Sequence, residues 1–454
     1  MTSRPTLPLL LLTLAACSSA EVGDLDTNGS TALDSTAAPV TTTMSESTGP
    51  LSPTSEEGTG GGGTTIEGAS ATDADTTGAS TTNETTTATT GGIDEPVLPL
   101  GGPCVLGPAA PGRLAVITND FIDPASLHVL DLATKKLSAD VAKAPSDPAL
   151  AWGDGKLVVI GRYGFNTLAV LDGQTYAPLA MHDVQIDGQL DVNPQALTFG
   201  PDGRAYLSAF ASAILPIYDL DQPPAEAVLG GIDLSEFADR DGSPEPGISF
   251  ICGGTLLVGI QRLVNFTPVD LSSFVAIDLA SGAPIDLDPG ADGTQGLPLL
   301  GPWPKQVRLD PTDPSGHTIL ALTSGVERID LVHASSSWAV TPEQLAAVEI
   351  TGFDLQAFEV AADGASAYIL ATDGDYPASA VFQVALDGAS KPTPMVSGLT
   401  TRERTLERIG DRLWIGDAEP KNPRLRVFDL GQNPAVEGPA IATPGAPYLF
   451  LPIP

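Results

Sequence analysis

The sequence predicts an all-β domain built from one repeated unit, and three observations support this. A short apolar segment that ends in Asp recurs seven times between residues 129 and 429. A strongly apolar segment precedes each of these endings. The chain also has 48 Gly and 41 Pro, and only 5% aromatic residues. This composition suits short strands and many turns better than long helices.

The two recurring segments are interpreted as successive strands of one sheet. The endings are Val129–Asp131, Val170–Asp172, Ile217–Asp219, Ala276–Asp278, Arg328–Asp330, Val384–Asp387 and Val427–Asp429. The apolar strands before them are Leu114–Thr118, Leu157–Gly161, Ala205–Ala209, Leu256–Ile260, Thr318–Leu322, Ala367–Ala371 and Leu413–Gly416. β-Branched residues between Gly- and Asp-containing turns are typical of strands, and Pro201-Asp202-Gly203 is typical of a hairpin turn. The motif-ending aspartates are expected to accept hydrogen bonds from turn amides.

A further strand opens each unit, and its position predicts how the domain closes. Six copies are Pro148–Trp152, Pro194–Phe199, Ile248–Ile251, Gln306–Leu309, Gln356–Val360 and Leu406–Ile409. The seventh is absent before Arg113 and appears at the end of the chain, as Ala446–Leu451. A repeat of roughly 40 to 60 residues with about four strands is typical of a β-propeller, in which packing around an axis buries both faces of each sheet. We therefore predict a seven-bladed β-propeller over residues 101–454, in which the C-terminal strand completes the first blade. The alternative is a pair of β-sandwiches with coincidental Asp endings.

The pattern over residues 112–454 resembles the broad YncE/YVTN and lactonase-like propeller group. The resemblance implies the fold. It also raises a hydrolase hypothesis, because propeller hydrolases of that kind use acidic or His residues near the central channel, sometimes with a metal. No family residue is carried over, because no family motif stands in this sequence.

Residues 1–16 have the features of a cleaved signal peptide: Arg4, an apolar run Leu7–Leu14 too short to span a bilayer, and small residues before Cys17. Leu14-Ala15-Ala16-Cys17 resembles the lipobox of bacterial lipoproteins, which implies that Cys17 carries acyl chains such as palmitate and anchors the protein in the membrane. Ser18 implies outer-membrane sorting by the enterobacterial rule, with the periplasmic or surface face left open. The alternative is an ordinary secretory signal with an accidental cysteine.

Residues 17–100 are predicted to be a disordered tether that starts at the lipid-modified Cys17. The segment is rich in Thr, Ser, Gly and acidic residues and contains no Lys or Arg. Such a composition buries too little apolar surface to offset chain entropy. A glycosylated stalk is the alternative interpretation. An acidic stalk after a lipobox is similar in style to myxobacterial lipoproteins of the cell envelope.

Two cysteines remain after Cys17, and export would place both in an oxidising compartment. Cys104 and Cys252 are therefore expected to form a disulfide that pins the end of the tether to the domain. The alternative is two unpaired thiols.

The net charge and the polar residues limit which ligands the chain is expected to bind. The formal charge is −35, which argues against nucleic-acid binding. The four histidines, His128, His182, His317 and His333, lack zinc-ligand spacing and are expected at surface or turn positions. Two acidic loops are candidate Ca²⁺ sites, because hard cations favour carboxylate oxygens. They contain Asp239, Asp241 and Glu245 in one case and Asp286, Asp288 and Asp292 in the other. The alternative is that both are solvated loops.

No catalytic set and no cofactor motif are recognised in the sequence. We therefore expect a membrane-anchored, exported propeller that binds a protein or glycan, or serves as a scaffold in an envelope complex, without catalysis. The competing hypothesis is a metal-dependent hydrolase or lactonase with an acidic site in the central channel.

Overall fold

A computed structural model describes residues 98–121, 124–186, 191–351, 354–372, 379–400 and 404–454. The predicted signal peptide, Cys17 and nearly all of the predicted tether lie outside these residues. Within them, no helix is both long and apolar enough to cross a bilayer.

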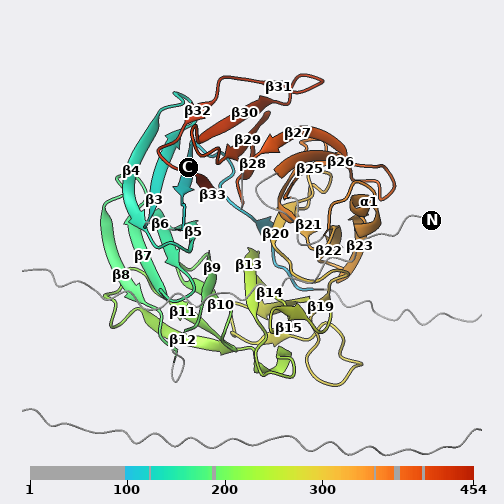
Figure 1. Ribbon diagram of the computed structural model, residues 1–454. Coiled ribbons are helices and arrows are strands. Elements are labelled where there is room, and N and C mark those ends of the chain that lie inside the picture. Colours follow the sequence, from blue (N-terminus) through green and yellow to red (C-terminus); the bar gives the residue numbers. More distant parts are fainter. Residues whose placement is uncertain (1–97, 122–123, 187–190, 352–353, 373–378, 401–403) are drawn as a thin grey trace, which may run out of the picture. The chain divides into compact units, whose positions relative to one another are not determined.

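The domain is all-β and forms a seven-bladed propeller, as predicted (Figure 1). Each blade is an antiparallel sheet that runs outward from its first strand, and in blade 4 the short strand β1 is added inside the first strand. Blade 1 consists of β33 (Pro447–Ile453), β2 (Arg113–Thr118), β3 (Ala125–Asp131) and β4 (Leu137–Ala144). Blade 2 consists of β5 (Pro148–Gly153), β6 (Lys156–Gly161), β7 (Thr167–Asp172) and β8 (Pro178–Asp183). Blade 3 consists of β9 (Pro194–Phe199), β10 (Ala205–Ala209), β11 (Ile214–Tyr218) and β12 (Val228–Asp233).

Blade 4 is the most elaborate sheet, because it gains strands at both edges. Its strands are β1 (Cys104–Val105), β13 (Pro246–Cys252), β14 (Thr255–Ile260), β17 (Ser273–Asp278), β18 (Pro284–Ile285) and β19 (Leu297–Pro298). Blade 5 consists of β20 (Gln306–Leu309), β21 (Thr318–Leu322), β22 (Val326–Asp330) and β23 (Ser335–Val340). Blade 6 consists of β24 (Leu355–Val360), β25 (Ser366–Thr372), β26 (Ser379–Ala385) and β27 (Thr393–Leu399). Blade 7 consists of β28 (Leu406–Ile409), β29 (Arg412–Asp417), β30 (Arg424–Asp429), β31 (Val436–Glu437) and β32 (Ile441–Ala442).

The ring closes as predicted, through the C-terminal strand. β33 pairs with β2 in an antiparallel register that runs from Arg113 opposite Ile453 to Thr118 opposite Pro447. The Arg113 side chain also donates a hydrogen bond to the carbonyl oxygen of Pro454 at 2.6 Å. The two ends of the propeller sequence therefore share one sheet, which leaves no open edge at the seam.

The core lies between adjacent blades. The second strands β6, β10 and β14 are buried at every position, because both faces of these strands are covered by neighbouring blades. This explains why they appear in the sequence as continuous apolar runs rather than as alternating patterns. Separate apolar clusters fill the spaces between blades 2 and 3 and between blades 4 and 5.

The antiparallel course of each blade gives the ring two different faces. The loops between blades and the loops from second to third strands lie on one side, here called the loop face. The turns from first to second and from third to fourth strands lie on the other side, here called the turn face. The insertions η1 (Ser235–Phe237), the hairpin β15 (Leu263–Val264) with β16 (Thr267–Pro268), and α1 (Pro342–Ala346) all belong to the loop face.

The recurring aspartates at the ends of the third strands cap turns on the turn face. Each accepts at least one hydrogen bond from a backbone amide two or three residues further along the chain. The seven residues are Asp131, Asp172, Asp219, Asp278, Asp330, Asp387 and Asp429. The predicted structural role of this motif is therefore confirmed.

Candidate functional site

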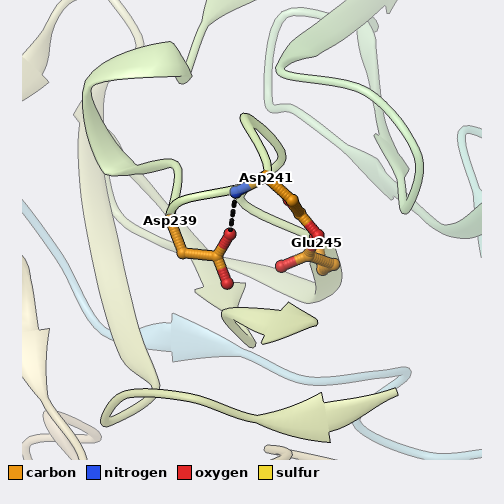
Figure 2. Close-up of side chains that lie close together, drawn as sticks. All are labelled: Asp239, Asp241 and Glu245. Carbon is orange, nitrogen blue, oxygen red and sulfur yellow. Dashed lines mark hydrogen bonds between the residues drawn. The ribbon is translucent and has the colours of Figure 1, made fainter. Parts of the chain in front are cut away.

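The acidic loop at residues 239–245 is a compact carboxylate cluster on the loop face. It connects η1 to β13, the first strand of blade 4, and its side chains point toward a common centre (Figure 2). The Asp241 amide donates to Asp239 Oδ1 at 3.0 Å, and the Ser243 amide donates to Asp241 Oδ1 at 3.0 Å. Oxygen atoms of Asp239, Asp241 and Glu245 all lie within 4.8 Å of one another, the one such group of three in the described part of the chain.

Glu245 is the buried member of this cluster. Glu245 is only 3% exposed. Its backbone lies in the left-handed region, with φ +46°. Glu245 Oε2 accepts a hydrogen bond from the Leu263 amide at 2.9 Å, at the start of the β15–β16 hairpin. Burial, with a smaller contribution from the nearby carboxylates of Asp241 and Asp239, raises the pKa of Glu245 to about 7. A cation placed in the cluster would oppose this effect, because it would stabilise the ionised form.

Asp239 supplies a second indication that the cluster is electrostatically incomplete. Its Oδ2 atom is buried and has no hydrogen-bond partner among the described residues. Three carboxylates suit a hard divalent cation, and water or a ligand would have to complete the six to eight oxygens that Ca²⁺ takes.

The second predicted Ca²⁺ loop has a different arrangement. Asp286 Oδ1 accepts hydrogen bonds from the amides of Asp288 and Gln295, and Asp288 Oδ1 accepts one from Gly290. These aspartates cap local turns, and the structure does not bring Asp286, Asp288 and Asp292 together as a ligand set.

Two of the four histidines correct the expectation that all would lie at surface or turn positions. His128 and His182 are 0% and 1% exposed, on β3 and β8. His128 Nε2 lies 2.7 Å from Thr118 Oγ1, and its Nδ1 accepts from the Asp140 amide at 2.9 Å. His182 packs edge-on against Tyr218, and its ring nitrogens have no hydrogen-bond partner among the described residues. Burial lowers the pKa of both imidazoles.

Exposed aromatic side chains gather on the loop face. Four aromatic side chains are strongly exposed: Phe121 (47%), Tyr163 (68%), Phe165 (45%) and Phe266 (72%). All four lie in loops from second to third strands, in blades 1, 2 and 4. Phe266 tops the β15–β16 hairpin and stacks on Phe210, with ring centroids 6.0 Å apart. The hairpin held by Glu245 therefore also carries the most exposed of these rings.

A charged cluster on the innermost strands was missed in the sequence. Arg308, Glu359 and Glu407 come from β20, β24 and β28, and their side chains are 23%, 5% and 13% exposed. Arg308 Nη2 contacts Glu359 and donates to Glu407 Oε2 at 3.1 Å. Burial raises the pKa of both carboxyls, and the proximity of Glu359 raises that of Glu407 further. The available signal was the presence of charged residues in three of the opening strands.

The remaining predicted site residues are the cysteines. Cys104 and Cys252 form a disulfide, and they lie directly opposite each other in the pairing of β1 with β13. Cys17 lies outside the described residues.

The fold defines the chain as a seven-bladed β-propeller. Its sequence matches no protein-family model and no curated protein. Among solved structures it is similar to a putative 6-phosphogluconolactonase from Bacteroides fragilis, with a TM-score of 0.51, 13% identity, and coverage of 75% of this chain and 98% of that one. A periplasmic gluconolactonase from Pseudomonas aeruginosa gives a TM-score of 0.48 and 15% identity, covering 75% of this chain and 99% of that one. At 13% identity the likeness to the Bacteroides fragilis protein shows the fold alone, and no residue role is transferred.

Proposed function

We infer that the chain is an exported propeller, anchored through a lipidated Cys17 in the cell envelope and sorted to the outer membrane, which binds an extracytoplasmic protein or glycan through its loop face. The observation that supports this role is the distribution of exposed aromatic rings. Phe121, Tyr163, Phe165 and Phe266 all belong to the loop face. Aromatic side chains are enriched where proteins bind partners, because they bury large areas at low entropic cost.

The binding hypothesis is tested by comparing the two faces in the full-length chain. A photo-crosslinking residue replaces Phe266 or Tyr163 on the loop face. The control position is Val436, which is 46% exposed and lies in blade 7 opposite Asp429, at the turn face. A discrete adduct from both loop-face positions in native membranes, and none from position 436, is expected. A glycan partner is tested in parallel on a glycan array, where Phe266→Ala should reduce any signal at least tenfold. Equal labelling at all three positions would argue against the proposal.

The lipid anchor has an independent test. The wild-type chain is expected in the detergent-rich phase after Triton X-114 partitioning, and Cys17→Ser in the aqueous phase. Cys104→Ser serves as the matched cysteine replacement, since it should leave the partitioning unchanged. A wild-type chain that stays in the aqueous phase would remove the anchor from the proposal without affecting the binding face.

A second candidate function is a metal-dependent hydrolase with an acidic channel site. The observation that favours it is the pair of adjacent carboxyls, Glu359 and Glu407, on innermost strands. Two adjacent carboxyl groups can divide the roles of general acid and general base between them. Hydrolysis of a sugar lactone by the wild-type chain, dependent on added Ca²⁺ and abolished by Glu407→Gln, would support this function over simple binding.

A further inference from the structure

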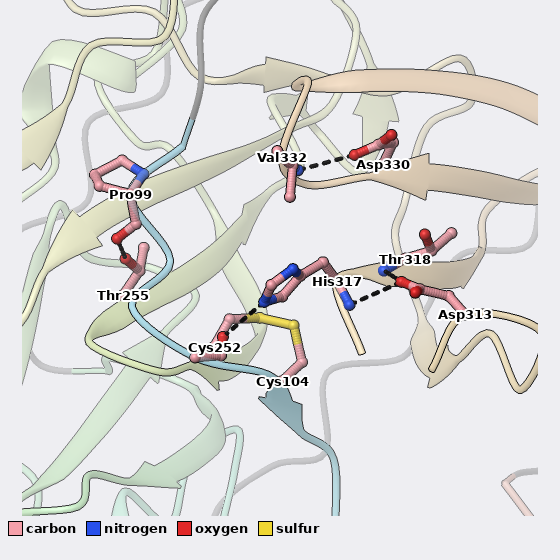
Figure 3. Close-up of a disulfide and its surroundings, with 10 residues drawn as sticks. Pro99, Cys104, Cys252, Thr255, Asp313, His317, Thr318, Asp330 and Val332 are labelled. Carbon is pink, nitrogen blue, oxygen red and sulfur yellow. Dashed lines mark hydrogen bonds between the residues drawn. A yellow bond between two sulfur atoms is a disulfide. The ribbon is translucent and has the colours of Figure 1, made fainter. Parts of the chain in front are cut away.

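The first described residues, 98–112, form a strap on the turn face (Figure 3). The strap is bonded to turns of blades 4 and 5 before it reaches β2. The Leu98 amide donates to the Val332 carbonyl at 3.2 Å, and the Cys104 amide donates to the Gly316 carbonyl at 3.0 Å. In the other direction, Gly254 donates to the Leu100 carbonyl at 3.0 Å. The predicted domain boundary at residue 101 therefore falls inside a packed segment.

Packing and covalent bonding both hold the strap to blade 4. Leu98 and Leu100 are 2% and 3% exposed and belong to the apolar cluster between blades 4 and 5. β1 then adds to the inner edge of β13, where the Cys104–Cys252 disulfide joins the two strands. Beyond β1 the chain crosses the middle of the ring to β2 in blade 1 (Figure 1).

The strap changes where a pull on the N-terminal side of the chain would act. β2 lies between β33 and β3 in the blade that closes the ring. Without the strap, tension would reach the first residue of β2 and strip that strand from its neighbours. Loss of β2 would release β33 and open the ring at its seam. With the strap in place, tension ends at Cys104, because a covalent bond to blade 4 must break before the following residues are loaded.

We propose that the strap and its disulfide form a force-bearing latch, which carries tension from the anchored tether into blade 4 and shields the seam of the ring. The proposal rests on the inferred membrane anchor, because an anchored protein that holds a partner is pulled from its N-terminal side. It also gives a purpose to the position of the disulfide, between the tether and the first strand of the ring.

The latch is tested by pulling single molecules of the full chain in optical tweezers. One handle is fused to the N-terminus and the other is attached through an azide-bearing residue at position 163 on the loop face. In the wild-type chain only residues 98–103, which precede the disulfide, should be released at low force, and the ring should open at high force. The Cys104→Ser/Cys252→Ser variant should first lengthen at low force, by less than the extended strap length of about 50 Å at roughly 3.5 Å per residue. It should then open at a clearly lower force than the wild type.

Pulling direction separates a latch from a general gain in stability. When the first handle is moved to the C-terminus, the double-serine chain and the wild type should differ much less than in N-terminal pulling. Adding dithiothreitol to a folded wild-type molecule already in the tweezers gives the same comparison without refolding a variant. Equal unfolding forces with and without the disulfide in N-terminal pulling, or an equal loss in both directions, would overturn the proposal. Neither result depends on lipid or partner, so a failure here is distinct from a failure of the proposed function.

Discussion

At the scale of single residues, Glu245 links the acidic loop to the β15–β16 hairpin, because its carboxylate accepts a hydrogen bond from the Leu263 amide. Its pKa is raised to about 7, so a proton competes with a cation for the cluster in the physiological range. We expect Ca²⁺ affinity to increase as pH rises from 6 to 8, because Glu245 becomes ionised. Isothermal titration calorimetry at the two pH values measures this change.

The two predicted loops supply the matched variants for this experiment. Asp241→Asn should reduce Ca²⁺ affinity at least tenfold, whereas Asp288→Asn should leave it unchanged, because Asp288 caps a local turn. Absence of Ca²⁺ binding at pH 8, or equal effects of the two substitutions, would show that the cluster is only a structural turn.

The two buried histidines are predicted to respond in opposite ways to the same substitution. His182→Phe removes ring nitrogens that have no partner among the described residues, so it should raise stability by about 1–2 kcal/mol. His128→Phe breaks contacts with Thr118 and the Asp140 amide and should cost about 1–3 kcal/mol. Urea unfolding at pH 7.5 tests both, and the same sign for both would contradict the assignment.

The same histidines predict acid sensitivity. Their pKa values are lowered in the folded state, so the unfolded chain binds more protons as pH falls below the ordinary value of 6.5. The contribution of the two neutral histidines to the free energy of unfolding is therefore fully present above pH 6.5. It is lost as pH decreases from 6.5 through their lowered folded-state pKa values. His182→Phe should flatten this loss, which unfolding curves between pH 7.5 and 5 would detect.

At the scale of elements, the β13–β14 turn and the strap depend on close contact at one glycine. Gly253 has φ +56°, and a Cβ there would lie 2.0 Å from the Leu100 carbonyl oxygen. Gly253→Ala should therefore displace the strap and speed amide hydrogen exchange at Leu100 and Cys104.

Gly203 in the β9–β10 turn is the matched control for this substitution. It also has a positive φ, of +82°, but a Cβ there would meet nothing within 4 Å. Gly203→Ala should cost only the backbone strain of about 1–2 kcal/mol and leave exchange in the strap unchanged. Similar strap exchange in the two variants would mean that the contact at Gly253 is relaxed easily.

At the scale of the whole molecule, stability depends on closing the ring. Deleting Pro447–Pro454 removes the inner strand of blade 1 and exposes the edge of β2. The shortened chain should lose its cooperative unfolding transition, and a synthetic peptide of residues 446–454 added in trans should restore it. An eight-residue deletion within the predicted tether, residues 80–87, is the control and should leave the transition unchanged. A cooperative transition in the shortened chain would show that a first blade of three strands is enough to hold the ring.

Local patterns explain why so much of the fold was predictable. Short apolar runs, Gly- and Asp-containing turns and the Asp endings act over a few residues, and the sevenfold count followed from their repetition. The seam followed from the single missing opening strand, which reappears at the C-terminus. The carboxylates of Asp239, Asp241 and Glu245 were also recognisable, because they are separated by only six residues.

The sequence by itself determined the class of fold, the number of blades, the closing strand and the turn-capping role of the aspartates, because each depends on contacts between neighbours along the chain or on a repeated pattern. Only the tertiary structure decided that Arg308, Glu359 and Glu407 meet, that His128 and His182 are buried, and that the exposed aromatic rings share one face. It also decided that the carboxylates of Asp239, Asp241 and Glu245 lie together, whereas those of Asp286, Asp288 and Asp292 do not. These outcomes depend on how blades distant in sequence pack around the axis, and local residue patterns do not encode that packing.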